Sequence, residues 1–176
     1  MHGINEALKF KPVRMAVLTV TDSRTAATDT SGDILVQRIE AAGHILAARD
    51  LVADDVGVIQ KTITAWIDDP AIEAVVTTGG TGLTGRDVTP EAVKPLFEKE
   101  IEGFSVIFHQ VSFQSVGLST LQSRAVAGLA KGTFIFALPG SNGAVKDGWD
   151  KVISHQLDSR HGPCNLVELM PRLMEK

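Results

Sequence analysis

The residues best suited to chemistry lie in one glycine-rich segment, residues 77–91, which reads TTGGTGLTGRDVTPE. Glycines allow positive backbone φ angles and let a ligand approach the main chain closely. The segment ends in a predicted helix start, with Thr89 as N-cap and Pro90 at the first helical position. Main-chain N–H groups near a helix N-terminus attract anions, above all phosphate. Together with Arg86 and Asp87, the segment predicts a site for a phosphate-bearing ligand.

Two common nucleotide-binding motifs overlap this segment, and neither fits in full. Residues 80–85 spell G-x-G-x-x-G, which suggests a nicotinamide-dependent oxidoreductase as a remote alternative. In that fold the last glycine already belongs to the crossover helix, whereas Pro90 here delays the helix start. Residues 80 and 85 also have P-loop spacing, but Arg86 and Asp87 stand where Lys and Ser or Thr are required. A turn that only reverses the chain is a further interpretation.

Composition sets the broad limits. A chain of 176 residues fits a single domain, residues 1–176, with a polar lead-in at residues 1–12 and an irregular tail at residues 159–176. The net charge of −4 argues against a nucleic-acid partner or an anionic membrane, and no apolar run is long enough to span a bilayer. The one cysteine, Cys164, excludes an internal disulfide and favours a cytoplasmic setting.

Buried strands and helices alternate along the chain. Apolar runs predict strands at residues 14–20, 44–53, 72–76 and 133–138, and helical patterns fall at about residues 30–42, 56–67, 90–100, 101–115, 121–129 and 144–157. The alternation predicts an α/β fold, a three-layer α/β/α sandwich with a mostly parallel central sheet. Right-handed crossovers bring the carboxyl ends of such strands to one edge, where ligands bind. The polar segments that follow the four strands, residues 21–24, 54–55, 79–87 and 139–143, are therefore expected to converge on one crevice.

Three sequence blocks carry a specific resemblance to a known family. TGGTG at residues 78–82 is followed by RDVTPE at residues 86–91 and then by LPGS at residues 138–141. This combination resembles the molybdopterin-binding family, which includes the MogA and MoaB proteins of molybdenum cofactor biosynthesis and the G-domains of plant and animal proteins such as gephyrin. The resemblance covers roughly residues 13–165 and implies the MogA-like molybdopterin-binding fold. It is strongest toward MoaB, through residues 29–32, 119–128 and 136–141.

The resemblance implies an enzyme, a molybdopterin adenylyltransferase. Active members of the family let the terminal phosphate of molybdopterin attack the α-phosphate of Mg-ATP, which releases pyrophosphate and activates the pterin for molybdate insertion. By position, Asp54 and Asp87 match the two catalytic aspartates, which would also hold Mg²⁺, with ATP and molybdopterin as substrates. Such chemistry requires charge neutralisation more than covalent help, and carboxylates with phosphate oxygens suit Mg²⁺. The alternative is a non-catalytic module in the same pathway that binds molybdopterin or a nucleotide.

Further residues are expected to bind the pterin and the nucleotide. They lie in the segments named above: Ser23, Arg24, Ser31, Gly79, Gly80, Thr81, Gly82, Arg86, Ser123, Arg124, Pro139, Gly140 and Ser141. Arginine suits the recognition of phosphate. Family members are trimers or hexamers, so the resemblance also implies a homo-oligomer, with other molybdenum cofactor biosynthesis proteins as further partners.

Several of these residues have a structural alternative. Asp54 is equally suited to cap the helix that begins near Val56. Asp87 is suited to a turn hydrogen bond before Thr89, and Arg124 to an ion pair with a surface acid. The Pro-Gly-Ser at residues 139–141 stands where MogA-type proteins commonly have Pro-Gly-Asn. That difference fits the MoaB branch, in which catalytic competence is not uniform.

Overall fold

The protein is built on a six-stranded sheet with the strand order β3-β2-β4-β7-β6-β5. The computed structural model describes residues 3–175, so the first two residues of the predicted lead-in and the last residue of the predicted tail lie outside it. The strands are β2 (Arg14–Val20), β3 (Ile45–Val52), β4 (Ala74–Thr78), β5 (Lys99–Glu100), β6 (Val126–Ala130) and β7 (Thr133–Leu138). The first four strands in the order are parallel, whereas β6 is antiparallel to β7 and to β5.

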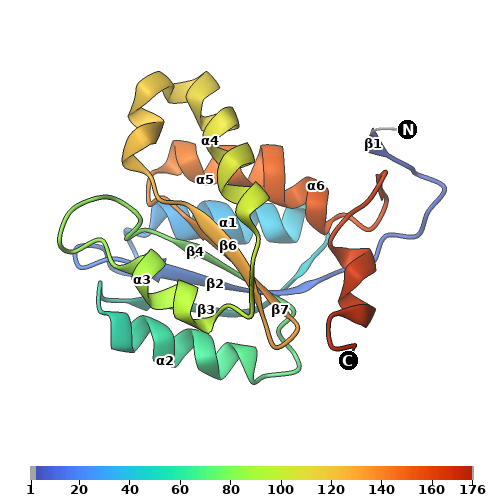
Figure 1. Ribbon diagram of the computed structural model, residues 1–176, viewed down its shortest axis with the longest axis horizontal. Helices are drawn as coiled ribbons and strands as arrows, with labels where there is room; N and C mark the ends of the chain where they lie inside the picture. Colours follow the sequence, from blue (N-terminus) through green and yellow to red (C-terminus); the bar gives the residue numbers. More distant parts are fainter. Residues whose placement is uncertain (1–2, 176) are drawn as a thin grey trace.

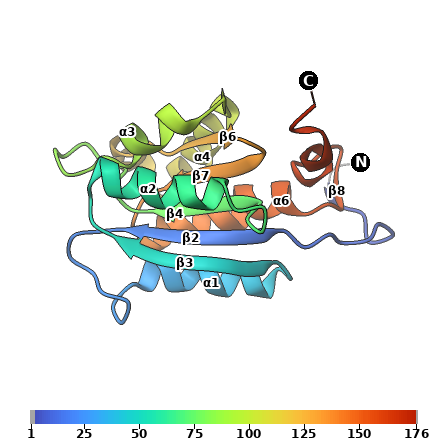
Figure 2. The same ribbon diagram turned by 90° about the horizontal axis from the view of Figure 1, so that it is seen from below.

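Helices cover both faces of this sheet (Figure 1). One face carries α1 (Thr30–Ala41), α4 (Glu102–Val116) and α5 (Asn142–Gly148), which continues through a π-helical turn (Trp149–Ile153) into α6 (Ser154–Leu157). The other face carries α2 (Val56–Ile67) and α3 (Thr89–Val93). The view from below shows β2 and β3 at the front, with α1 beneath them (Figure 2). The predicted three-layer α/β/α sandwich with a mostly parallel sheet is therefore confirmed.

Local sequence explains why the main elements form where they do. Every residue of β2 except Arg14 is buried, as expected for a central strand with helices on both faces. In α2, Ile59, Ile63 and Ile67 recur at intervals of four and pack against the sheet. The carboxylate of Asp55 accepts a hydrogen bond from the N–H of Val58 and caps this helix.

Two predicted helices are wrong in whole or in part. Residues 121–129 contain β6 instead of a helix, because Val126 and Ala130 belong to one core while Ala127 and Leu129 belong to the other. That alternation is a strand pattern buried on both faces. The helix predicted for residues 90–100 ends at Val93 and gives way to a short 3₁₀ turn (Lys94–Leu96) and β5. Pro95, which has no N–H to continue the α-helical bonds, lies in that turn.

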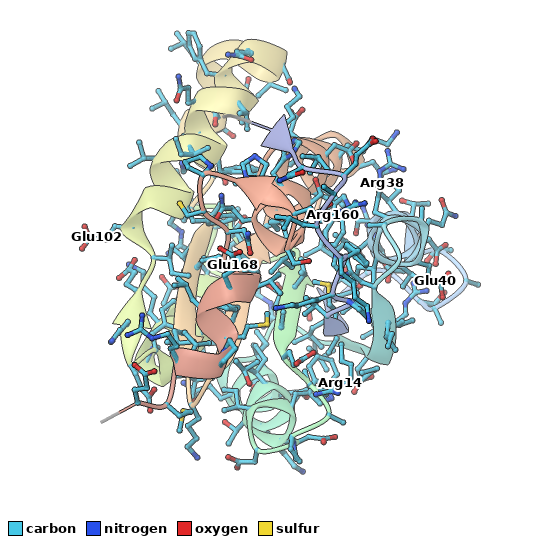
Figure 3. All side chains as sticks on the ribbon, turned by 90° about the vertical axis from the view of Figure 1, so that its right-hand side faces the viewer. Arg14, Arg38, Glu40, Glu102, Arg160 and Glu168 are labelled. Atoms are coloured by element: carbon cyan, nitrogen blue, oxygen red, sulfur yellow. The ribbon has the colours of Figure 1, made fainter. Side chains whose placement is uncertain are left out.

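The N-terminal segment of the described chain pairs with a segment near its C-terminal end. Strand β1 (Gly3–Ile4), from the predicted lead-in, pairs with β8 (His161–Gly162), from the predicted tail, and a 3₁₀ helix (Val167–Arg172) follows. Figure 3 views this end, with Arg160 and Glu168 near its centre and Glu40 and Glu102 projecting on opposite sides. No helix within residues 3–175 is long and apolar enough to cross a membrane.

Candidate functional site

A cavity of about 630 Å³ opens at the carboxyl edge of the parallel strands. The loops that follow β2 and β4 lie together at the left of Figure 1, as the topology requires. The lining of the cavity includes these predicted site residues: Ser23, Arg24, Ser31, Gly79, Gly80, Thr81, Gly82, Asp87, Ser123, Pro139, Gly140 and Ser141. Three further predicted residues, Asp54, Arg86 and Arg124, are not part of the lining and lie around it.

The glycine loop brings three chain segments into close contact. Gly79 has a φ of +101° and Gly80 a φ of +63°, and a Cβ atom at Gly79 would overlap the carbonyl oxygen of Val20. The N–H of Gly79 donates to the carbonyl of Leu138 at 3.0 Å, which ties β4 to the end of β7. No side chain fits at Gly79, so at this position the cavity lining is main chain packed against β2.

Thr89 fastens this loop to the start of α3. The prediction that Thr89 is the N-cap is wrong, because Thr89 is the first residue of α3 and its side chain forms no cap. Instead, its hydroxyl donates to the carbonyl of Gly79 at 2.9 Å and its N–H donates to the carbonyl of Gly80 at 2.9 Å. Both carbonyl oxygens are thereby turned toward α3 and held in place.

Asp87 combines a structural role with exposure to the cavity. Its Oδ2 accepts hydrogen bonds from the hydroxyl of Thr84 at 2.6 Å and from the N–H of Thr84 at 2.9 Å. The Thr84 hydrogen bonds lower the pKa of Asp87 below its ordinary value, and they outweigh the opposing effect of burial. The carboxylate thus closes the turn, as the structural alternative required, and remains charged at the cavity wall.

Asp54 has no capping role, since its neighbour Asp55 caps α2. The Oδ1 of Asp54 would lie 2.9 Å from a Cβ atom at Gly80, so the carboxylate borders the glycine loop. Burial raises the pKa of Asp54, the negative charges of Asp22 and Asp87 raise it further, and the charge of Arg86 opposes them. A cation between these carboxylates would relieve that repulsion.

The donor set suits a magnesium ion that is bound together with a nucleotide. Within the described chain, no group of three or more His, Cys, Asp or Glu side chains could hold a metal alone. Asp54 and Asp87 supply two carboxylates that border the glycine loop, at Gly80 and at Gly82. Because Mg²⁺ prefers one or two carboxylates with phosphate oxygens and water, these residues fit Mg²⁺ in the presence of a polyphosphate.

The three predicted phosphate-binding arginines occupy different positions. Arg24 lies in the cavity wall, where its Nη1 donates to the hydroxyl of Ser31 at 2.8 Å and its Nη2 donates to the carbonyl of Gly140 at 3.3 Å. Arg124 lies behind the glycine loop, with its Nε bound to the carbonyl of Gly82 at 2.8 Å and its Nη2 to the carbonyl of Asp87 at 2.7 Å. Arg124 also forms an ion pair with Glu91, so it braces the loop.

Sequence reasoning missed Asp22, which forms an ion pair with the third arginine. The Oδ2 of Asp22 accepts from Nε of Arg86 at 2.8 Å, and Nη2 of Arg86 contacts the same oxygen. The Oδ1 of Asp22 accepts the main-chain N–H of Asp54 at 3.1 Å. A usable signal was present in the sequence, because Asp22 is the second residue after β2 and is next to the predicted Ser23.

Asp29 belongs to the segment, residues 29–32, that carries part of the resemblance to MoaB, but it was not among the predicted site residues, and its side chain is only 1% exposed. Its carboxylate caps α1 through the N–H of Gly32 at 2.9 Å and accepts hydrogen bonds from Thr19 at 2.6 Å and from Arg49 at 3.0 Å. Burial acts to raise the pKa of Asp29, but these hydrogen bonds outweigh it and the pKa lies below its ordinary value. Asp29 thereby fixes the start of α1, which carries Ser31 at the cavity.

The far wall of the cavity comes from the chain around α4 and from α5. It includes Ser112, Thr120 and Asp147, none of which was among the predicted site residues. Among the described residues, the hydroxyls of Thr120 and Ser123 are buried without a hydrogen-bond partner. Buried hydroxyls normally find a partner, so these two groups beside the cavity are left unsatisfied.

Fold and site together define an α/β protein with a cavity at the carboxyl edge of its parallel strands, and comparison with known proteins specifies the family. Residues 16–159 match the family described as "Probable molybdopterin binding domain", and the chain belongs to this family. The protein is therefore a member of the molybdenum cofactor biosynthesis proteins, as the sequence predicted.

Individual relatives agree. The chain is 46% identical to molybdenum cofactor biosynthesis protein B of Escherichia coli K12 over 157 residues, which cover 89% of this chain and 92% of the relative. It is 43% identical to the protein of that name from Bacillus subtilis, with coverage of 82% and 86%. A crystal structure of a molybdenum cofactor biosynthesis protein B superposes with a TM-score of 0.85 at 36% identity, over 94% of this chain and 98% of that one. The tungsten cofactor synthesizing protein MoaB from Pyrococcus furiosus gives a TM-score of 0.73 at 35% identity, over 82% and 92%.

Proposed function

We propose that the protein adenylylates molybdopterin with Mg-ATP. The observation that supports this function best is the pair of carboxylates, Asp54 and Asp87, at the glycine loop. The Oδ1 of Asp54 would lie 2.9 Å from a Cβ atom at Gly80, and the Oδ2 of Asp87 would lie 2.7 Å from one at Gly82. Two acidic groups beside a glycine-rich loop suit a polyphosphate that arrives with its cation.

In the proposed reaction, the terminal phosphate of molybdopterin attacks the α-phosphorus of ATP. A new phosphoanhydride bond forms, the bond from the α-phosphorus to the bridging oxygen breaks, and pyrophosphate leaves with the electron pair. The residues at the site act by orientation and charge, as expected for phosphoryl chemistry. Bound Mg²⁺ would neutralise charge on the triphosphate, and Asp54 and Asp87 would hold it. The glycine loop would position the reacting phosphates, with Arg24 and Ser141 in the adjoining wall.

A turnover assay tests this proposal. The purified protein is incubated with molybdopterin, ATP and Mg²⁺, and adenylylated pterin and pyrophosphate are measured by chromatography. We expect product with the natural protein. With Asp87→Asn we expect turnover to fall by about 100-fold or more, because that variant lacks the negative charge that would attract the cation. Equal turnover by Asp87→Asn would contradict the role of Asp87.

A second candidate function uses the same cavity without chemistry. In that case the protein binds molybdopterin or a nucleotide and delivers it to another biosynthesis protein. Pyrophosphate release separates the two functions, since binding without release favours the non-catalytic module. We place either function in the cytoplasm, where reduced Cys164 is stable.

We also propose that the protein assembles as a trimer or hexamer. Apolar side chains are unusually exposed on α4 and on the 3₁₀ helix that follows it (Gly117–Gln122), and exposure reaches 66% at Val106, 73% at Leu118 and 72% at Leu121. Exposed apolar side chains on two successive elements are a common feature of an interface. Light scattering during size-exclusion chromatography should give three or six times the chain mass, and a monomer would contradict the proposal.

A further inference from the structure

The carboxylate of Asp22 joins three loops of the site. Asp22 follows β2, and its two oxygens bind Arg86 of the glycine loop and the main chain of Asp54 after β3. The Nε of Arg86 lies 2.8 Å from Oδ2 of Asp22, and the N–H of Asp54 lies 3.1 Å from Oδ1. A single side chain thus sets the relative position of Arg86 and of one proposed magnesium-binding aspartate.

Of the three arginines at the site, Arg86 has the partner that is most easily exchanged for a ligand. The side chain of Arg86 is 69% exposed and that of Asp22 is 39% exposed, so water competes with the ion pair. Arg24 and Arg124 instead donate to carbonyl groups of the loops that form the cavity, where exchange would disturb the main chain. Exposed ion pairs contribute little net free energy, whereas a phosphate offers an arginine a more highly charged acceptor.

The charges around Arg86 support such an exchange. The hydrogen bond from Arg86 lowers the pKa of Asp22 below its ordinary value, so Asp22 is ionised and holds the guanidinium at neutral pH. Asp54 and Asp55 also attract Arg86, which keeps the arginine at the acidic rim of the glycine loop. A nucleotide bound at this loop would bring its phosphates to the same rim.

We propose that Asp22 is a positioning residue that competes with the nucleotide's phosphates for Arg86. In the free protein Asp22 holds Arg86 at the rim of the site. When the nucleotide binds, Arg86 exchanges the carboxylate for phosphate oxygens, while Asp22 keeps its hydrogen bond from the main chain of Asp54. This inference rests on the proposed function, because it requires a nucleotide in the cavity.

The test measures ATP binding by calorimetry in the presence of EDTA, so that no metal contributes. Asp22→Asn removes the charge that binds Arg86 but keeps an amide oxygen for the N–H of Asp54. We expect this variant to bind ATP more tightly, by up to about fivefold, which is the range that an exposed ion pair allows. In an Arg86→Ala background the same change should leave the ATP affinity unaltered, because there is no guanidinium for Asp22 to release.

Asp55→Asn is the matched control. It also removes one negative charge near Arg86, and asparagine still caps α2. If Asp55→Asn tightens binding as much as Asp22→Asn does, or if Asp22→Asn acts equally with and without Arg86, the effect is one of net charge and the inference is wrong. Weaker ATP binding by Asp22→Asn, with a lower melting temperature, would mean a purely structural role and would also overturn it. If the natural protein binds no ATP with or without Mg²⁺, the proposed function itself fails.

Discussion

Replacing Asp54 with asparagine is expected to abolish adenylylation without loss of stability. The variant keeps the size and shape of the side chain but loses the negative charge that would hold the cation of Mg-ATP. We expect turnover to fall by about 100-fold or more, as is typical when a charge-stabilising group of an active site is removed. Turnover and thermal unfolding of the same preparation measure both quantities.

The expected stability follows from the raised pKa of Asp54. Burial and the charges of Asp22 and Asp87 penalise the ionised carboxylate in the folded protein. The group therefore lowers the stability of the folded state at pH values above its folded pKa, and the penalty disappears as the pH falls through that pKa. At neutral pH the asparagine variant should melt at the same temperature as the natural protein or higher, and the difference should vanish in acid.

The same shift predicts how activity depends on pH. Because Asp54 must be ionised to hold the cation, kcat/KM should decline as the pH falls, and the decline should begin at a higher pH than for an ordinary aspartate. Asp55→Asn is the control, since Asp55 caps α2 at the neighbouring position. Full turnover by Asp54→Asn, or loss of turnover only through unfolding, would contradict this role.

Replacing Gly79 with alanine is expected to have the largest structural effect. The residue has a φ of +101°, and a Cβ atom there would overlap the carbonyl oxygen of Val20 in the neighbouring strand. Both the strained φ and the overpacking are unfavourable, and together they should lower the free energy of unfolding by about 2–5 kcal/mol. Urea unfolding measures this change.

Gly85→Ala is the matched control for that measurement. Gly85 belongs to the same loop, but a Cβ atom there would contact nothing within 4 Å, and its backbone does not adopt a positive φ. This variant should differ from the natural protein by less than about 0.5 kcal/mol. If Gly79→Ala is as stable as Gly85→Ala and still binds molybdopterin, the close approach of β2 and β4 is not required.

Much of the fold was predictable because its signals are local. A short stretch of sequence is enough to predict each of several elements: the buried strands β2 and β7, the apolar stripe of α2 and the glycine loop. Strand β6 was missed because Val126 and its neighbours are small apolar residues, which fit a helix as well as a strand until β7 and β5 supply partners. Pro95 sets the end of the helix at Val93. The apolar positions on both sides of Pro95 fit a helical pattern, so the pattern alone predicted a longer helix.

The candidate site was predictable to a similar extent. The rule that parallel strands end at one edge brought the four polar segments together, and most of their predicted residues line one cavity. What the sequence did not reveal is which partner each charged side chain selects. Asp22 binds Arg86, Asp29 binds Thr19 and Arg49, and Arg124 braces the glycine loop, and these contacts join residues far apart in the chain.

The most direct test of the proposed site is a crystal structure with molybdopterin, Mg²⁺ and an ATP analogue that does not react. We expect both ligands in the one cavity, with phosphate groups against residues 79–82 and the metal ion bound by Asp54 and Asp87. A nucleotide outside the cavity, or a metal ion held by neither aspartate, would contradict the proposed mechanism.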